Sequence, residues 1–389
     1  MSGADGIRVL HLAEAMVRGG AESLIVEHAR CAGPGVRVFV CALNREGPAL
    51  EAAAAAGATI VRLPRGGGPL RPLARVHALA RAMRAARIDA VNGHNPTGGL
   101  YAALAGRLAG VRAVVRTEHS LHYAGRHSGL YPLIEGVLTL MTRRVVCVCR
   151  AVLDSHARRL PWAARRFVTV ANGISSAPRT RPRQETRAAL GADPGAPLLL
   201  TVGSLTTQKA QHVLIDGFAR ARRDVPQALL LIAGDGPLRA ALEARAAAFG
   251  VADGVRFLGA REDVADLIEA CDLFVLSSER EGLPVTLLEA MRGGRAAVVT
   301  RIGGMPEAVE DGVTGRIVPA ADAGALGVAL TALLGDPAAR EAMGRAAATR
   351  WQAAFTAGRM VAATEALYRE LLGTPAPAAA EAEARHAAR

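Results

Sequence analysis

Short apolar runs alternate with longer amphipathic stretches along the whole chain. The runs have the length and composition of buried parallel strands, and the stretches between them carry apolar residues at helical spacing. In the first half, strands are expected at 7–12, 36–42, 59–63, 88–92, 113–116, 145–148 and 167–170. In the second half, they are expected at 198–202, 228–233, 255–258, 272–276, 296–300 and 315–318.

This alternation predicts an α/β fold built from doubly wound parallel sheets, with ligands at the carboxyl ends of the strands. The pattern restarts after a charged, proline-containing segment at 177–184, which has the composition of an interdomain linker. Two Rossmann-like domains are therefore expected. The predicted divisions are an N-terminal domain at 1–178, a C-terminal domain at 179–350, a last helix at 351–372 and a disordered tail at 373–389.

Composition narrows the class of protein. The chain has 389 residues, of which 51% are hydrophobic, so it has ample material for two cores. No window of about 18 apolar residues lacks charge, and the N-terminus carries no leader pattern, so we expect a soluble, cytoplasmic protein. The five cysteines match neither a disulfide framework nor a zinc spacing, which predicts reduced thiols.

Positive charge is concentrated in the first half. Residues 1–178 contain 23 arginines and 10 acidic residues, a net of +13, whereas the remainder contains 24 basic and 25 acidic residues, a net of −1. This excess suggests an anionic partner. A nucleic acid is one alternative, although an aromatic content of 3% leaves few platforms for base stacking. Arginine supplies all of the basic residues except Lys209.

The segment 277–291 carries the strongest candidate chemistry. It follows a predicted strand, Gly282 permits a tight turn and Pro284 suits a first helical turn, so a helix N-terminus should form an anion site there. Glu281 precedes this helix, and Glu289 lies about two turns further on the same face. Two carboxylates beside an anion site favour a ligand that also carries hydroxyl groups. The alternative is two ordinary surface charges, which the apolar neighbours of Glu289 argue against.

Lys209 lies in a second candidate anion site. The segment 203–210 follows a strand and opens a helix, which is the geometry of a phosphate-binding loop. A lysine there supplies a mobile point charge to a diphosphate.

The first half offers weaker candidates at predicted strand ends. Gly19 and Gly20 join a strand to a helix, and such a pair is either a plain turn or a close approach to a ligand. His119 ends a strand and is interpreted as functional, while His94 ends another and is left open. Structural roles are assigned to His11, His122 and His127.

The segment EGLPVTLLEAM resembles the two-glutamate motif of the retaining glycosyltransferases of family 4, which have the two-domain GT-B fold. The similarity continues through 234–239, 255–259, 302–307 and 311–315. It implies two domains facing a cleft, with the last helix packing back toward the N-terminal domain. Catalytic roles are implied for His119, Lys209 and Glu281. Donor-binding roles are implied for Gly19, Gly20, Ser204, Lys209, Gly234, Gly236, Leu258, Arg261, Glu281, Gly282, Leu283, Pro284, Val285 and Glu289.

Within that resemblance, Glu281 would contact the donor sugar, Glu289 the ribose, and the backbone near 283–285 the diphosphate. Ser204 stands where the family often has arginine, so Lys209 is the main cation expected at the leaving group.

The resulting expectation is a metal-independent, retaining hexosyltransferase that uses a UDP- or GDP-linked sugar and no cofactor. Its acceptor would be a lipid-linked sugar or glycolipid in cell-surface polysaccharide synthesis. Arginines at 71–87 and 158–166 would dock on the inner face of the cytoplasmic membrane. A nucleotide-sugar epimerase or a phosphorylase on a similar scaffold is an alternative, and a basic nucleic-acid-binding protein is another.

Overall fold

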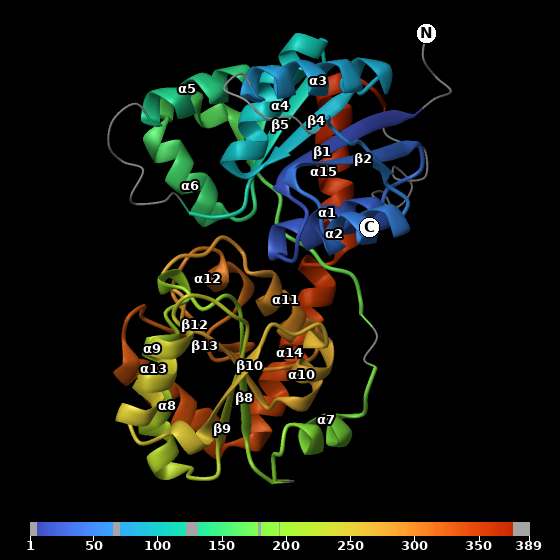
Figure 1. Cartoon of the computed structure of the whole chain (residues 1–389). Coiled ribbons are helices and arrows are strands. Elements are labelled where there is room, and N and C mark those ends of the chain that lie inside the picture. The colour runs from blue at the N-terminus through green and yellow to red at the C-terminus, as the bar shows by residue number, and fades with distance from the viewer. Residues whose placement is uncertain (1–5, 65–70, 122–130, 178–179, 194, 376–389) are drawn as a thin grey trace, which may run out of the picture. The chain divides into compact units, whose positions relative to one another are not determined.

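The computed structural model describes residues 6–64, 71–121, 131–177, 180–193 and 195–375. The chain divides into two compact units (Figure 1). Unit 1 comprises residues 1–173 and 357–389, and unit 2 comprises residues 174–356. Within the described residues, no helix combines the length and apolar composition needed to cross a bilayer.

Unit 1 contains a seven-stranded, fully parallel sheet in the order β3-β2-β1-β4-β5-β6-β7. Its strands are β1 (Ile7–Ala15), β2 (Val36–Arg45), β3 (Thr59–Ile60), β4 (Ala90–His94), β5 (Ala113–Glu118), β6 (Arg144–Cys147) and β7 (Phe167–Thr169). Its helices are α1 (Gly20–Arg30), α2 (Pro48–Ala55), α3 (Arg71–Ala85), α4 (Asn95–Ala109), α5 (Tyr131–Met141), α6 (Arg150–Arg159), the 3₁₀ helix η2 (Pro161–Arg166) and α15 (Ala357–Leu372).

Unit 2 contains a six-stranded parallel sheet in the order β10-β9-β8-β11-β12-β13. Its strands are β8 (Leu198–Val202), β9 (Leu229–Ala233), β10 (Val255–Gly259), β11 (Leu273–Leu276), β12 (Ala297–Thr300) and β13 (Gly315–Val318). Its helices are α7 (Arg183–Ala189), η3 (Thr207–Lys209), α8 (Gln211–Asp224), α9 (Arg239–Ala248), η4 (Ala252–Gly254), α10 (Val264–Ala270), α11 (Val285–Arg292), α12 (Met305–Ala308), α13 (Ala323–Gly335) and α14 (Pro337–Ala354).

The doubly wound fold predicted from the alternating pattern is confirmed. All thirteen expected strands are present, although β3 contributes only Thr59 and Ile60 to the sheet. In each sheet the strand order reverses once, between β1 and β4 in unit 1 and between β8 and β11 in unit 2. At such a switch point the connecting helices leave to opposite faces of the sheet, so the carboxyl ends of the two central strands are accessible to a ligand.

The last helix differs from the sequence expectation. A single helix at 351–372 was expected, but Trp351 belongs to the last turn of α14 and α15 begins only at Ala357. At the break, the backbone N–H of Ile174 donates to the carbonyl of Phe355 at 3.0 Å. This hydrogen bond joins the two segments through which the chain passes from one unit to the other. Helical periodicity alone does not reveal the break between α14 and α15.

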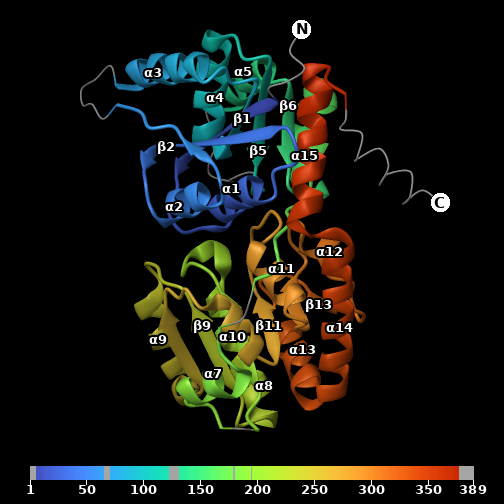
Figure 2. The same ribbon diagram turned by 90° about the vertical axis from the view of Figure 1, so that its right-hand side faces the viewer.

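Helix α15 packs against the sheet of unit 1, as Figure 2 shows. Tyr368 is buried there, and its hydroxyl accepts a hydrogen bond from Asn92 on β4 at 2.9 Å. Glu365 accepts the backbone N–H of Gly33 at 2.9 Å. These contacts anchor the C-terminal helix to unit 1.

Candidate functional site

An ion pair occupies the switch point of unit 2. Strands β8 and β11 pair directly, and the segments that follow them carry Lys209 and Glu281. The Lys209 Nζ lies 2.6 Å from Oε1 of Glu281, and the Ser278 hydroxyl donates to the same oxygen at 2.8 Å. The Glu281 side chain is almost entirely buried, while that of Lys209 is 21% exposed. The sequence singled out these two residues separately, and the fold brings them together.

The two segments are fastened to each other by their own polar groups. The Ser277 hydroxyl lies within 3.1 Å of the carbonyl oxygens of Lys209 and Ala210. The Gln208 side chain donates to the carbonyl of Arg280 at 2.9 Å, and the Glu279 N–H donates to the carbonyl of Gln208 at 2.9 Å. These hydrogen bonds hold the two segments, and with them the ion pair, in position.

Two glycines bring a third loop against the Lys209 loop. Gly234 has a φ of +142°, and a Cβ there would lie 1.9 Å from the carbonyl oxygen of Gly203. A Cβ on Gly236 would lie 2.5 Å from the carbonyl oxygen of Leu205. Only glycine fits either position, so these residues shape the edge of the site through close backbone packing.

Other implied donor residues lie near the carboxyl ends of β8, β10 and β11. Ser204 accepts a hydrogen bond on its carbonyl from Gln211, at the start of α8. Gly282 accepts the N–H of Gly304 at 2.6 Å, and Arg261 pairs with Asp263. Buried Leu283 is followed by Pro284, which caps α11 at Val285, and Leu258 lies near the end of β10.

Glu289 lies in different surroundings from Glu281. It lines a pocket of about 420 Å³ together with Ser176, Ile268, Arg292 and Trp351, and Glu281 is not part of that lining. Burial raises the pKa of the Glu289 carboxyl.

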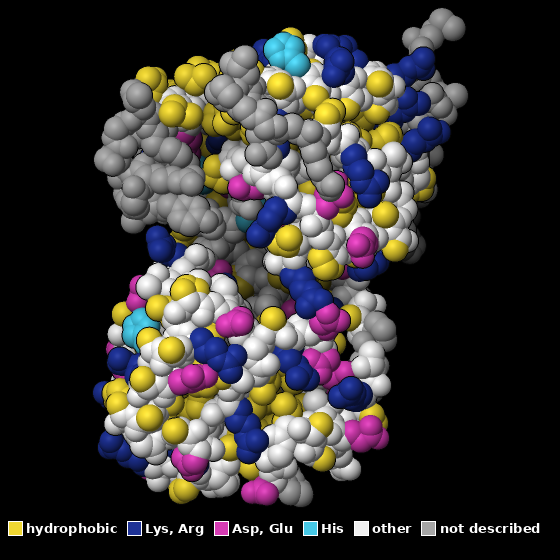
Figure 3. All heavy atoms as spheres, viewed as in Figure 1, with side chains coloured by type: hydrophobic (Ala, Val, Ile, Leu, Met, Phe, Trp, Pro, Cys, Tyr) yellow, Lys and Arg dark blue, Asp and Glu magenta, His cyan; other side chains and the backbone are white. Residues whose placement is uncertain are grey.

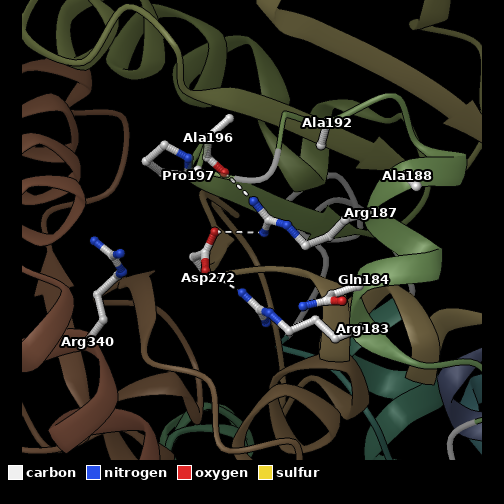
Figure 4. Close-up of a pocket in the computed structure, with 10 residues that line it drawn as sticks. Arg183, Gln184, Arg187, Ala188, Ala192, Ala196, Pro197, Asp272 and Arg340 are labelled. Carbon is white, nitrogen blue, oxygen red and sulfur yellow. Dashed lines mark hydrogen bonds and ion pairs between the residues drawn. The ribbon is translucent and has the colours of Figure 1, made fainter.

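A second pocket, of about 440 Å³, lies at the amino ends of the strands in the sheet of unit 2 (Figure 4). Its lining includes Asp272, which precedes β11, and Arg340. Arg183 and Arg187 of α7 both pair with Asp272 and also donate to backbone carbonyls. Since doubly wound sheets bind ligands at the carboxyl ends of strands, these arginines are best explained as anchors for α7.

Four histidines form a row at the carboxyl edge of unit 1. His11 on β1, His94 at the end of β4 and His119 just after β5 are joined by hydrogen bonds. The ring of His28, from α1, stacks on His11 with centroids 4.5 Å apart. The His11–His94 and His94–His119 centroids are each 5.2 Å apart.

Burial keeps this row uncharged at neutral pH. It lowers the pKa of His28 and His119 to about 4, and it lowers the pKa of His11 and His94 well below the ordinary value. Nearby imidazoles reinforce the effect for His11, His28 and His94. The sequence predicts a structural role for His11. The structure shows in addition that His11 is hydrogen-bonded to His94. His122 and His127 lie outside the described residues.

The glycine pair opens α1 at the same edge of the sheet. Gly20 is the first residue of α1, and Gly19 caps it in an extended conformation. Both residues are exposed, and a Cβ on Gly19 would lie 2.2 Å from a carboxyl oxygen of Glu22. The N-terminus of α1 is therefore accessible at the switch point of unit 1.

Sequence reasoning missed the polar mesh around Lys209 and the histidine row. Ser277 and Ser278 directly follow a predicted strand, as His94 and His119 follow or end theirs. Polar residues at the ends of neighbouring parallel strands were the available signal.

Comparison with known proteins defines the class. Residues 18–177 match the family model described as Glycosyltransferase Family 4, and residues 182–350 match Glycosyl transferases group 1. The chain belongs to this family of GT-B glycosyltransferases, as the sequence motifs indicated.

Individual relatives agree with this assignment. The chain is 32% identical over 299 residues to the alpha-maltose-1-phosphate synthase of Mycobacterium tuberculosis, covering 70% of this chain and 77% of the relative. It is 35% identical over 188 residues to a GDP-mannose-dependent phosphatidylinositol monomannoside mannosyltransferase of Mycolicibacterium smegmatis, covering 45% and 48%. The structure of Anabaena HepE with UDP-glucose superposes with a TM-score of 0.79 at 21% identity, covering 92% and 99%.

Acid should destabilise unit 1 through its histidine row. Because the pKa of His28 and His119 is about 4 when folded and about 6.5 when unfolded, the unfolded chain binds more protons between these values. The free energy of unfolding should therefore be intact above pH 6.5 and fall as the pH drops toward 4, by up to about 1.4 kcal/mol per pH unit for each histidine. Urea unfolding at several pH values measures this slope.

A matched pair of variants isolates the contribution. His28→Phe should flatten the slope, whereas His77→Phe, at an exposed position on α3, should leave it unchanged. Equal slopes in both variants and the parent would contradict the assignment.

Proposed function

We propose that this protein is a retaining glycosyltransferase that moves a sugar from a UDP- or GDP-linked donor to a lipid-linked sugar or glycolipid. The observation that carries the donor half is the contact between Lys209 and Glu281 at the switch point of unit 2. A diphosphate needs a cation and a sugar needs acceptors for its hydroxyl groups, and this pair supplies both within hydrogen-bond distance of each other.

The ion pair is compatible with a bound diphosphate. A lysine ammonium has three donors, so Lys209 can keep its bond to Glu281 and still donate to a phosphate oxygen. The carboxylate of Glu281 has further lone pairs to accept sugar hydroxyls. Two proteins named above support a nucleotide-sugar donor, because one is GDP-mannose-dependent and the other was solved with UDP-glucose.

The proposed chemistry is a front-face displacement. The acceptor oxygen bonds to the anomeric carbon as the bond from that carbon to the phosphate oxygen breaks, and the departing phosphate takes the acceptor proton. Lys209 stabilises the negative charge that develops on the diphosphate. Glu281 acts by orientation, since its Oε1 already accepts from both Lys209 and Ser278 and is a poor nucleophile in that state.

The acceptor half of the proposal rests on an exposed apolar face in unit 1. On α5, Leu133, Ile134, Val137 and Leu140 are 47–64% exposed although their spacing places them on one side of the helix. Trp162 of η2 is 57% exposed and packs beside α5, where its ring would lie 3.4 Å from a Cβ on Gly136. Figure 3 shows apolar side chains gathered where α5 lies.

Basic side chains border this apolar face. Arg107 of α4 donates to the carbonyls of Leu140 and Met141, and Arg158 and Arg165 are exposed on either side of Trp162 along the chain. Exposed apolar side chains with an arginine rim suit the surface of an anionic bilayer. A lipid-linked acceptor would be presented at such a surface.

Only part of the two arginine groups named from the sequence fits this role. In 158–166, Arg159 pairs with buried Glu135, and Arg166 donates to the carbonyl of Thr142. In 71–87, the apolar stripe packs on the core as expected except for Leu73, which is 61% exposed. The docking face is therefore better defined by α5, Arg158, Trp162 and Arg165.

Substitutions at the ion pair test the donor site. Glu281→Gln should lower kcat/KM at least about a hundredfold, since it removes charged hydrogen bonds worth roughly 3 kcal/mol. Lys209→Ala should be more damaging than Lys209→Arg, which keeps the charge. Glycosyl transfer from a panel of nucleotide sugars, with and without acceptor, measures both and separates transfer from epimerisation.

Arg223→Gln is the matched control, because it removes a charge from an exposed position of α8 outside both pockets, and it should keep the parental rate. Near parental rates in the Lys209 and Glu281 variants would overturn the site.

Metal independence follows from the proposed role of Lys209. The chain contains no Asp-x-Asp pair, and Lys209 stands where a metal would otherwise neutralise the leaving group. Activity should survive excess EDTA. A strict requirement for added Mn²⁺ or Mg²⁺ would show that the leaving group is neutralised in another way.

Liposome flotation tests the docking face. Binding should require anionic lipid, weaken as salt rises from about 50 to 500 mM, and fall sharply in Val137→Asp and in Arg158→Gln/Arg165→Gln. Val328→Asp and Arg223→Gln, at exposed positions of unit 2, should bind as the parent does. Full activity on a soluble acceptor without any binding to anionic vesicles would overturn the lipid half of the proposal.

A further inference from the structure

Three imidazoles in unit 1 form a continuous hydrogen-bonded chain. Nδ1 of His11 lies 2.9 Å from Nε2 of His94, and Nδ1 of His94 lies 2.9 Å from Nε2 of His119. His119 Nδ1 is shielded from solvent and has no hydrogen-bond partner among the described residues. His28 stacks on His11, and no described hydrogen bond links it to the chain.

A count of the ring protons shows that the tautomers of the three histidines depend on one another. Each neutral imidazole carries one proton, and each N···N bond must contain one. Two of the three protons therefore lie between rings, and the third lies at one end of the chain, on Nδ1 of His119 or on Nε2 of His11. The tautomer of His119 thus depends on His11, although these two rings are each bonded to His94 and not to one another.

At the His119 end of the hydrogen-bonded histidines, Nδ1 is expected to carry no proton. An N–H group that is buried without an acceptor is rare because it loses its bond to water and gains nothing in return. With Nδ1 of His119 bare, His119 donates through Nε2 to His94, and His94 donates through Nε2 to His11. The third proton then resides on Nε2 of His11.

We propose that His11 and His94 are positioning residues that hold His119 as its Nε2–H tautomer, so that Nδ1 is kept as an acceptor for a substrate hydroxyl. The assignment of that hydroxyl to a sugar rests on the proposed function. Burial supports the neutral state, since it lowers the pKa of all three rings. A hydroxyl that donates to Nδ1 replaces an orphaned lone pair with a hydrogen bond and leaves both bonds of the chain in place.

The tautomer can be observed directly in the protein without any ligand. In protein labelled with ¹⁵N-histidine, protonated and unprotonated ring nitrogens have well-separated ¹⁵N shifts, and His119→Asn identifies the signals of His119. At pH 7.5 the parent should show His119 with Nε2 protonated and Nδ1 bare. A protonated Nδ1 in the parent would overturn the proposal.

Three variants distinguish an effect of the hydrogen bonds between the histidines from an effect of ring packing alone. His11→Phe keeps a ring but removes the acceptor for His94, so one unpaired N–H remains, either on Nε2 of His94 or on Nδ1 of His119. The parental preference is then lost, and His119 should show a detectable share of the Nδ1–H tautomer. His11→Asn places an oxygen near the position of Nδ1 and should restore the parental tautomer. His28→Phe preserves the stacked ring outside the chain and should leave His119 unchanged.

An unchanged His119 tautomer in a folded His11→Phe protein would contradict the coupling, as would a change in His28→Phe. The far-ultraviolet circular dichroism spectrum of each variant establishes that it is folded.

A rate measurement extends the test to substrate. His11→Phe should lower kcat about tenfold or more at unchanged donor KM, and His11→Asn should recover most of that loss. Parental kcat in a variant whose tautomer has switched would overturn the role of Nδ1 in the reaction. Because the ¹⁵N shifts need no donor, a protein without transferase activity but with a coupled His119 would refute the proposed function alone.

Discussion

A reversal in the order of parallel strands determines where the polar groups of this protein meet. In unit 2, β8 and β11 are neighbours in the sheet although β9 and β10 lie between them in sequence. Their carboxyl ends are therefore adjacent, and the residues that follow them, Lys209 and Glu281, come within 2.6 Å of each other. The hydroxyls and amides of Ser277, Ser278 and Gln208 then hold this contact in place.

The same constraint acts in unit 1 with a different chemical outcome. There His11 in the middle of β1 meets His94 at the end of β4, and His94 meets His119 just after β5. Burial keeps these three imidazoles uncharged. In unit 2 the partners carry opposite charge and remain available to an anion. One architecture thus builds a charged site on one sheet and an uncharged hydrogen-bonded relay on the other.

The hydrophobic pattern predicted the strands because a strand that is buried on both faces of a parallel sheet consists almost entirely of apolar residues. It predicted Lys209 and Glu281 as site residues because both follow such runs. It could not predict that His11 bonds to His94, since that bond depends on strand order, which the pattern leaves open. The pattern also could not predict the break before α15. It could not predict that Leu73 and the apolar side of α5 are exposed, because periodicity indicates that a helix has an apolar side and does not indicate what covers that side.

The most direct test of this account is a crystal structure of the protein with a nucleoside diphosphate bound. The account predicts phosphate oxygens within hydrogen-bond distance of Lys209 Nζ, at the carboxyl ends of β8 and β11, with Glu281 still within reach of the same ammonium group. A diphosphate bound instead among Arg183, Arg187 and Arg340, at the amino ends of these strands, would contradict it.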